Sequence, residues 1–211
     1  FPKHRQTLLF SATYSDPIRA LAVSLLRDPL TIDVSPRNST VEGIKHWLIP
    51  VDKKRKSELF SYLLRKNAWG QVLVFVKTRQ GVEQLVDTLR AQGIRADSIH
   101  GDKPQSARLL ALERFKSAEV QVLIATDVAA RGLDIEDLPL VVNVDLPIVA
   151  EDYIHRTGRT GRAGATGEAI SLVCADEVRQ LSAIEVLMHQ TLTRIDEQGF
   201  EPEHRVPLTD A

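Results

Sequence analysis

Val72-Leu73-Val74-Phe75-Val76 is a run of successive apolar residues, most of them β-branched. A second run, Val122-Leu123-Ile124-Ala125, has the same character. A strand with one solvent-exposed face alternates apolar and polar residues, whereas a parallel strand buried on both faces is apolar throughout. The two runs therefore predict a parallel sheet that is covered on both faces.

The sequence around these runs alternates between strand and helix patterns from about residue 43 onward. Strands are predicted at Lys45–Val51, Gln71–Thr78, Ala96–His100, Val120–Thr126, Leu140–Asp145 and Glu168–Cys174. Amphipathic stretches predict helices at Gly81–Gln92, Gln105–Phe115 and Val178–His189. This alternation implies right-handed crossovers and an open α/β domain, in which ligands bind at the carboxyl ends of the strands.

The composition of the 211-residue chain, with 43% hydrophobic and 26% charged residues, is ordinary for a globular protein. Its net charge of -1 means that any nucleic-acid binding must rest on a local basic surface. The single cysteine, Cys174, excludes an internal disulfide and is expected to be a buried, inert thiol. No apolar run reaches the roughly 18 residues of a membrane span. No zinc-spaced Cys/His cluster or nucleophile elbow is present.

The first part of the chain does not fit the central pattern. Gln6–Phe10 and Leu30–Val34 predict strands around a helix at Asp16–Leu26, capped by Ser15 or by its own first residue. One such unit cannot bury enough apolar surface to fold alone. We therefore expect residues 1–34 to be the tail of a preceding domain that exposes apolar side chains, namely Leu8, Leu9, Phe10, Leu21, Leu25 and Leu26. This surface could also cause non-native self-association.

The remaining boundaries follow from composition. Residues 35–42 are polar and turn-prone, as in a linker, and residues 43–190 form the main domain. Residues 191–211 are expected to be an extended segment that frays from Phe200 onward.

The segment His155-Arg156-Thr157-Gly158-Arg159-Thr160-Gly161-Arg162 places three arginines three residues apart. Guanidinium groups match phosphate with a fixed fork of donors, and the glycines would let a polyanion approach the backbone. Arg159 and Arg162 can project from one face of a helical turn or from a glycine-hinged loop. A phosphate-binding segment is the sharper interpretation, and a solvated basic helix end is the alternative.

Polar groups also follow the other predicted strands. Thr126 and Asp134 could hold a phosphate and a ribose, although both residue types also form turns and caps. His100–Arg108 opens a helix, and helix N-termini bind anions. Thr78-Arg79 repeats the arrangement of buried strand, polar turn and helix start. Taken singly, each of these segments is a weak indication.

Two other segments have ordinary interpretations. The hydroxyls of Ser11 and Thr13 at the end of an apolar run are typical of caps. The basic run Lys53-Lys54-Arg55-Lys56 is more typical of a solvated helix start than of a nucleic-acid patch.

Taken together and in order, these segments resemble the C-terminal half of a DEAD-box RNA helicase. The matching segments are Leu9–Thr13 (motif III), Val74–Thr78 (motif IV), His100–Arg108 (the HGxxxQxxR element), Ala125–Asp134 (motif V) and His155–Arg162 (motif VI). The resemblance covers about residues 6 to 190, and its wording is most similar to bacterial members of the RhlE type. Thr157 stands where isoleucine is common in the family.

The resemblance implies two RecA-like domains that close around ATP and an RNA strand. This chain would carry the second domain (residues 43–190) after a C-terminal remnant of the first (residues 1–34). Arg159 and Arg162 would be catalytic arginine fingers that bind ATP together with Asp134. RNA contacts are implied for Thr78, Arg79, Gly101, Gln105, Arg108 and Thr126. Interdomain coupling is implied for Ser11, Thr13, Asp127, Arg131, His155 and Arg156.

The resemblance also implies what lies elsewhere. The sequence has no GxxxxGK[ST] loop and no Asp-Glu-Ala-Asp motif, so ATP and Mg²⁺ are expected to be held mainly by an N-terminal RecA-like domain. The chain alone is predicted to be inactive as an ATPase, with no metal site of its own. The implied partners are RNA and that domain, in the cytoplasm and away from membranes. Two alternatives remain, a superfamily 2 DNA translocase domain and a non-catalytic RNA-binding or annealing module.

Overall fold

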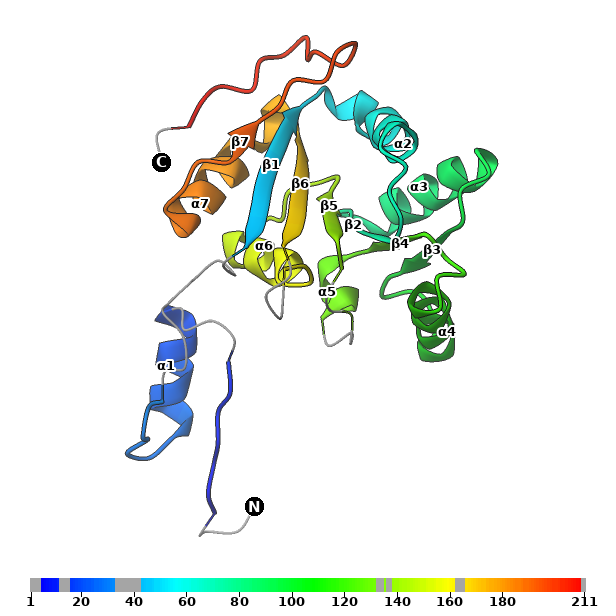
Figure 1. Ribbon diagram of the computed structural model, residues 1–211. Coiled ribbons are helices and arrows are strands. Elements are labelled where there is room, and N and C mark those ends of the chain that lie inside the picture. Colours follow the sequence, from blue (N-terminus) through cyan, green and yellow to red (C-terminus); the bar gives the residue numbers. More distant parts are fainter. Residues whose placement is uncertain are drawn as a thin grey trace. The chain divides into compact units, whose positions relative to one another are not determined.

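The protein is described here by a computed structural model of residues 5–11, 16–32, 43–131, 135, 138–161 and 166–209 (Figure 1). The chain divides into two compact units, residues 1–39 and residues 40–211.

Within its described residues, the second unit is built on one parallel sheet with the strand order β3-β4-β2-β5-β6-β1-β7. The strands are β1 (Ile44–Pro50), β2 (Val72–Phe75), β3 (Ala96–Ile99), β4 (Val122–Ala125), β5 (Leu140–Asn143), β6 (Gly167–Val173) and β7 (Thr193–Arg194). The helices of this unit are η1 (Lys53–Arg55), α2 (Lys56–Lys66), α3 (Arg79–Ala91), α4 (Gln105–Lys116), α5 (Asp127–Ala130), α6 (Ala150–Thr157), η2 (Ala175–Glu177) and α7 (Val178–Met188). The predicted open parallel sheet is confirmed, and all six predicted strands form with ends that differ from the prediction by at most three residues.

Helices cover both faces of this sheet, as Figure 1 shows. Val74 and Ile124 pack with the apolar residues of α2 and α3 on one face. Their neighbours Leu73 and Leu123 pack with α4 and α5 on the other face, where α6 and α7 form a further cluster with β1 and β6. Because successive side chains of a strand point to opposite faces, burial on both faces accounts for the unbroken apolar runs. No described helix is long and apolar enough to cross a membrane.

The C-terminal segment is more ordered than its sequence indicates. Thr193–Arg194 adds a short strand beside β1, and the side chains of Phe200 and Val206 are buried. The guanidinium carbon of Arg55 lies 4.4 Å from the centre of the Phe200 ring. The expectation that the chain frays from Phe200 is therefore wrong for the described residues, because this aromatic side chain anchors the segment.

The first unit contains α1 (Asp16–Leu25), close to the predicted helix. The described residues 5–11 and 30–32 form no strand, so the two predicted strands are absent there. The apolar exposure expected for this unit is present, with Phe10 87% and Leu8 65% exposed, while Leu26 is half-buried. Ser15 and residues 33–42 lie outside the described residues.

Candidate functional site

Four neighbouring strands of the second unit end in register. Ala125 pairs with both Ile99 and Phe75, and Phe75 in turn pairs with Asn143. The loops that follow β3, β4, β2 and β5 therefore start at the same level of the sheet. These loops carry most of the predicted site residues, so the fold brings segments that are distant in sequence to one edge.

Arg156 is the most highly connected side chain at this edge. It lies on α6, is 2% exposed, and donates through Nε and NH2 to the two carboxylate oxygens of Asp127 at 2.6 and 2.8 Å. Its NH1 donates to Asn143 Oδ1 at 2.9 Å and to the Asp145 carbonyl at 2.6 Å. The guanidinium also stacks on the Phe75 ring, 4.9 Å from its centre. The donors of the Arg156 guanidinium are thus bound to acceptors of the protein itself, and the side chain joins the start of α5 to α6.

A buried polar chain continues from Arg156 into the domain. Asn143 donates through Nδ2 to Ser171 Oγ at 3.2 Å, and Tyr153 interacts with the same serine. The Tyr153 hydroxyl lies 3.0 Å from Nδ1 of His46. Burial lowers the pKa of His46 from 6.5 to about 4, so the imidazole is neutral at physiological pH. Sequence reasoning missed this chain, although Asn143 interrupts an apolar strand and so carried a signal.

The predicted coupling and catalytic residues meet in a shallow hollow beside Arg156. Its lining is Phe75, Asp127, Ala130, Arg131, Asp152, His155, Arg156 and Arg159. Arg131 donates to Asp152 Oδ1 at 2.7 Å, and this hydrogen bond raises the pKa of Arg131 further. His155 and Arg159 are half-buried at the rim. The hollow therefore gathers five of the predicted residues, namely Asp127, Arg131, His155, Arg156 and Arg159.

The arginine segment leaves the helix before Arg159. The helix α6 ends at Thr157, Gly158 caps it, and the Arg159 carbonyl accepts from the Leu138 N–H at 3.1 Å. Arg159 therefore lies in a loop after Gly158, while Arg162 lies outside the described residues. Gly161 has φ 71°, and a Cβ there would lie 2.5 Å from Ile44 Cγ1. Close packing on β1, rather than approach of a polyanion, is what requires glycine at this position.

The residues expected to touch RNA after β2 have local partners. Thr78 Oγ1 accepts from the Gly81 N–H at 3.0 Å, so the hydroxyl caps α3. Arg79 forms an ion pair with Asp102 in the loop after β3, and both side chains are more than half exposed. The Arg79–Asp102 pair therefore links the start of α3 to the loop after β3.

The remaining predicted contacts lie after β3 and β4. A Cβ built on Gly101 would meet nothing within 4 Å. Arg108 donates to Gln105 Oε1 and to the Ala129 carbonyl, each at 3.1 Å, which ties α4 to α5. Its buried Nε has no hydrogen-bond partner. Thr126 stands at the N-cap of α5 without a side-chain capping bond, so the cap interpretation does not apply to its hydroxyl.

A histidine that the sequence left unassigned orients this edge. Nδ1 of His100 accepts from the Asp102 N–H at 3.3 Å, so Nε2 carries the proton and faces Glu83 Oε1 at 2.7 Å. Burial alone would raise the pKa of Glu83, but hydrogen bonds from Ser98 and His100 outweigh it and lower the pKa. The carboxylate thus stays charged and holds the loop that carries Gly101.

Three predicted residues, Thr13, Asp134 and Arg162, lie outside the described residues. Ser11 is described, exposed and part of the first unit. Cys174 is buried as expected, and burial raises the pKa of its thiol.

Comparison with known proteins identifies the fold and the family. Residues 55–164, just over half of the chain, match the model of the helicase conserved C-terminal domain. The chain is 39% identical over 98% of its length to the DEAD-box ATP-dependent RNA helicase CshA of Geobacillus kaustophilus, and 39% identical over 95% of its length to CshA of Bacillus subtilis. The chain belongs to the DEAD-box helicase family. The resemblance predicted from its motifs is therefore confirmed, while the RhlE subtype stays a prediction.

Solved DEAD-box structures share the fold. Saccharomyces cerevisiae Dbp5 bound to RNA and ADP BeF3 matches with a TM-score of 0.83 and 33% identity, over 92% of this chain and 52% of Dbp5. Escherichia coli SrmB bound to regulator of ribonuclease activity A matches with a TM-score of 0.73 and 36% identity, over 78% of this chain and 98% of that one. The chain spans 45% and 40% of the two CshA proteins. The chain contains the C-terminal helicase domain of a DEAD-box protein.

Proposed function

We propose that this chain is the C-terminal half of an ATP-dependent RNA helicase, in which RNA stimulates ATP hydrolysis. The Arg156–Asp127 pair carries the proposal, because it fastens the loop after β4 to the helix that precedes Arg159. It thereby sets the arginine segment beside the aligned strand ends. The CshA relatives are named DEAD-box ATP-dependent RNA helicases, which supports the same activity.

At the nucleotide, Arg159 and Arg162 would act as arginine fingers and Asp134 would accept from the ribose hydroxyls. Positive charge aimed at a transferring phosphoryl group increases the rate by roughly 10³–10⁵ in other NTPases. Mg²⁺ would be bound mainly by the N-terminal RecA-like domain. This chain by itself would then bind nucleotide weakly and hydrolyse none.

On RNA, the loops after β2, β3 and β4 would contact phosphates and 2′-hydroxyls rather than base edges, through Thr78, Arg79, Gly101, Gln105, Arg108 and Thr126. The open space at Gly101 supports close approach of an RNA backbone. Arg79 would exchange Asp102 for a phosphate, because an exposed ion pair is weak. Such contacts bind RNA without reading its sequence.

Coupling between the two ligands would run through Asp127, Arg131, His155 and Arg156, with Ser11 and Thr13 acting from the first RecA-like domain. In this proposal residues 1–34 belong to that first domain, residues 35–42 link the two, and residues 43–190 form the second. Exposed apolar side chains of the first unit would support non-native self-association of the isolated chain. The whole enzyme would work in the cytoplasm, where its RNA substrates lie.

The proposal is tested by ATP hydrolysis of the intact protein with RNA and with DNA of equal sequence. We expect RNA to stimulate hydrolysis and DNA to leave it near the basal rate. Equal stimulation by DNA would favour a DNA translocase. RNA binding by the intact protein without any hydrolysis would favour an annealing module.

A further inference from the structure

Lys56 is a buried cation in a position where the sequence indicates a solvated one. The side chain lies at the start of α2, and the residue is 3% exposed. Its ammonium donates to Glu177 Oε2 at 2.5 Å, to the Val144 carbonyl at 2.7 Å and to Asp145 Oδ1 at 3.4 Å. The expectation of a solvated face is therefore wrong for Lys56, whereas Lys53 in the same run is exposed.

Glu177, at the end of η2, completes the cluster from the other side. Its Oε1 accepts from the Leu146 N–H at 2.9 Å, and its Oε2 accepts from the Cys174 N–H at 3.1 Å. Lys56 and Glu177 thus form a buried ion pair. Most of their other hydrogen bonds are to backbone groups, namely those of Val144, Leu146 and Cys174. Neither residue belongs to a segment that carries the DEAD-box resemblance.

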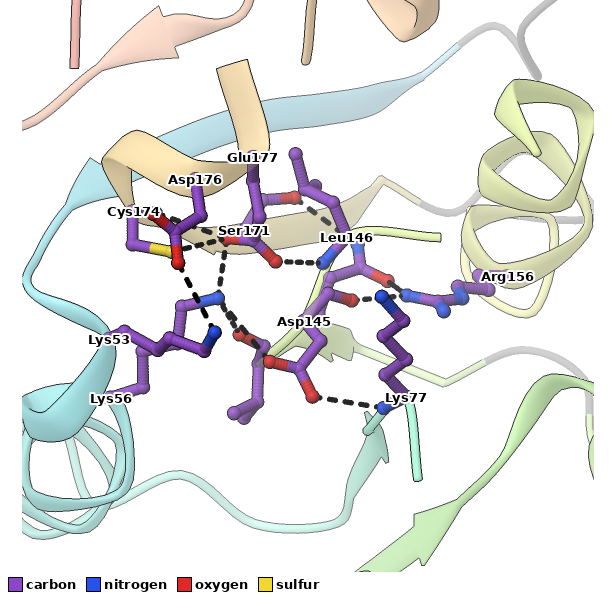
Figure 2. Close-up of polar contacts among 12 residues, drawn as sticks. Lys53, Lys56, Lys77, Asp145, Leu146, Arg156, Ser171, Cys174, Asp176 and Glu177 are labelled. Atoms are coloured by element: carbon purple, nitrogen blue, oxygen red, sulfur yellow. Dashed lines mark hydrogen bonds and ion pairs between the residues drawn. The ribbon is translucent and has the colours of Figure 1, made fainter. Parts of the chain in front are cut away.

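The segment that they hold, residues 144–146, also receives Arg156. The Asp145 carbonyl accepts from Arg156 NH1 at 2.6 Å, and Asp145 Oδ2 accepts from the Lys77 N–H at 2.9 Å. Figure 2 shows Lys56 and Glu177 on one side of this segment and Arg156 on the other. A shift of about 1 Å in the segment would take the Arg156 contact out of hydrogen-bond range.

A buried ion pair is a poor means of adding stability, because desolvation opposes its attraction and an apolar pair serves as well. Charge-assisted hydrogen bonds to backbone groups are directional, however, and they fix a peptide in one place. We infer that Lys56 and Glu177 are positioning residues for Arg156, and so for the arginine segment that follows it. The positioning of Arg156 is independent of the proposed function. Only its effect on ATP hydrolysis, through the arginine segment, rests on that function.

The test compares two neutralised ion pairs that both involve α2. Lys56→Met with Glu177→Gln removes the inner pair, and Asp145 keeps its hydrogen bond from the Lys77 N–H. Lys66→Met with Glu197→Gln removes the outer pair, whose atoms are 2.6 Å apart, and serves as the control. Hydrogen exchange of the Arg156 Nη1–H, which donates to the Asp145 carbonyl, is followed by NMR in the ¹⁵N-arginine-labelled chain.

We expect exchange of the Arg156 Nη1–H to speed up roughly tenfold in the inner variant, the factor that loss of its hydrogen bond to the Asp145 carbonyl brings. The outer variant should leave it within about twofold. A merely structural role would speed up buried core amides such as that of Leu123 by the same factor. Proportional acceleration of Arg156 and Leu123, or no difference between the two variants, would overturn the inference. If the double variant unfolds, the same measurement is made on Glu177→Gln alone. This variant removes the ion pair but keeps a side-chain oxygen that can accept from the Leu146 N–H.

Activity separates this inference from the proposed function. In the intact protein, the inner variant should lower the kcat of RNA-stimulated ATP hydrolysis. If exchange at Arg156 changes while Arg156→Lys leaves hydrolysis unaltered, the positioning stands and the proposed function fails. If hydrolysis requires Arg156 but the hydrogen-exchange rate of Arg156 is unchanged in the inner variant, Lys56 and Glu177 do not position Arg156.

Discussion

Replacing Arg156 by lysine should destabilise the second unit strongly, although the charge is kept. The guanidinium makes two hydrogen bonds to Asp127, one to Asn143 and one to the Asp145 carbonyl. A lysine ammonium is a single nitrogen and cannot reach both carboxylate oxygens and both remaining acceptors. At least two buried acceptors would lose their donor.

The expected loss follows from these contacts. Each buried acceptor left without a donor costs about 1–3 kcal/mol, and breaking a buried ion pair costs about 3–5 kcal/mol. Because lysine keeps part of the pairing with Asp127, we expect a loss of about 3 kcal/mol in the free energy of unfolding. A domain of ordinary stability, about 5–15 kcal/mol, would remain folded.

Urea unfolding followed by tryptophan fluorescence measures this loss, since Trp47 and Trp69 both pack against the core of the second unit. Arg131→Lys is the matched control, because Arg131 also pairs with an aspartate but its side chain is 62% exposed. An exposed pair is worth about 0–1 kcal/mol. Equal losses in the two variants would refute the assignment of Arg156 as the connection between α5 and α6.

Two further predictions concern pH and RNA contact. The pKa of His46 falls from 6.5 unfolded to about 4 folded, so the stability tied to its neutral form is present above pH 6.5 and is lost as pH falls toward 4. Between pH 7.5 and pH 5, this group should lower the free energy of unfolding by about 2 kcal/mol. His46→Gln should remove this pH dependence. The control His189→Asn, at an exposed histidine, should keep it. Gly101→Ala should leave stability within about 0.5 kcal/mol, because its Cβ meets nothing, yet weaken RNA binding measured by fluorescence anisotropy. Gly70→Ala, equally open and located before β2, should weaken neither, and equal RNA affinity in the two variants would remove Gly101 from the RNA face.

The sheet could be predicted from sequence because its signal is local and strong. Val72–Val76 and Val122–Ala125 are apolar at every position, which only burial on both faces explains. The strands predicted at Gln6–Phe10 and Leu30–Val34 could not be judged in this way, because an apolar run says nothing about whether a neighbouring strand is present.

The site residues that follow strands in recognisable motifs could be predicted from sequence. The buried charged and polar side chains that support them could not. Lys56 stands among basic residues, so it looks solvated, although Leu59, Phe60 and Leu63 follow it at helical spacing on the buried face. His46 and Tyr153 meet across many residues of sequence, and no local pattern connects them. The polar support of the site therefore had to be seen in three dimensions.

The central claim is that this domain supplies arginine charge to the triphosphate of an RNA-stimulated ATPase. RNA-stimulated hydrolysis by the intact protein carrying Arg159→Ala tests it most directly, with the exposed α7 variant Arg179→Ala as the control. The account predicts a loss of roughly 10³-fold in kcat for Arg159→Ala and a change within about twofold for the control. Hydrolysis by Arg159→Ala at the rate of the control would contradict it.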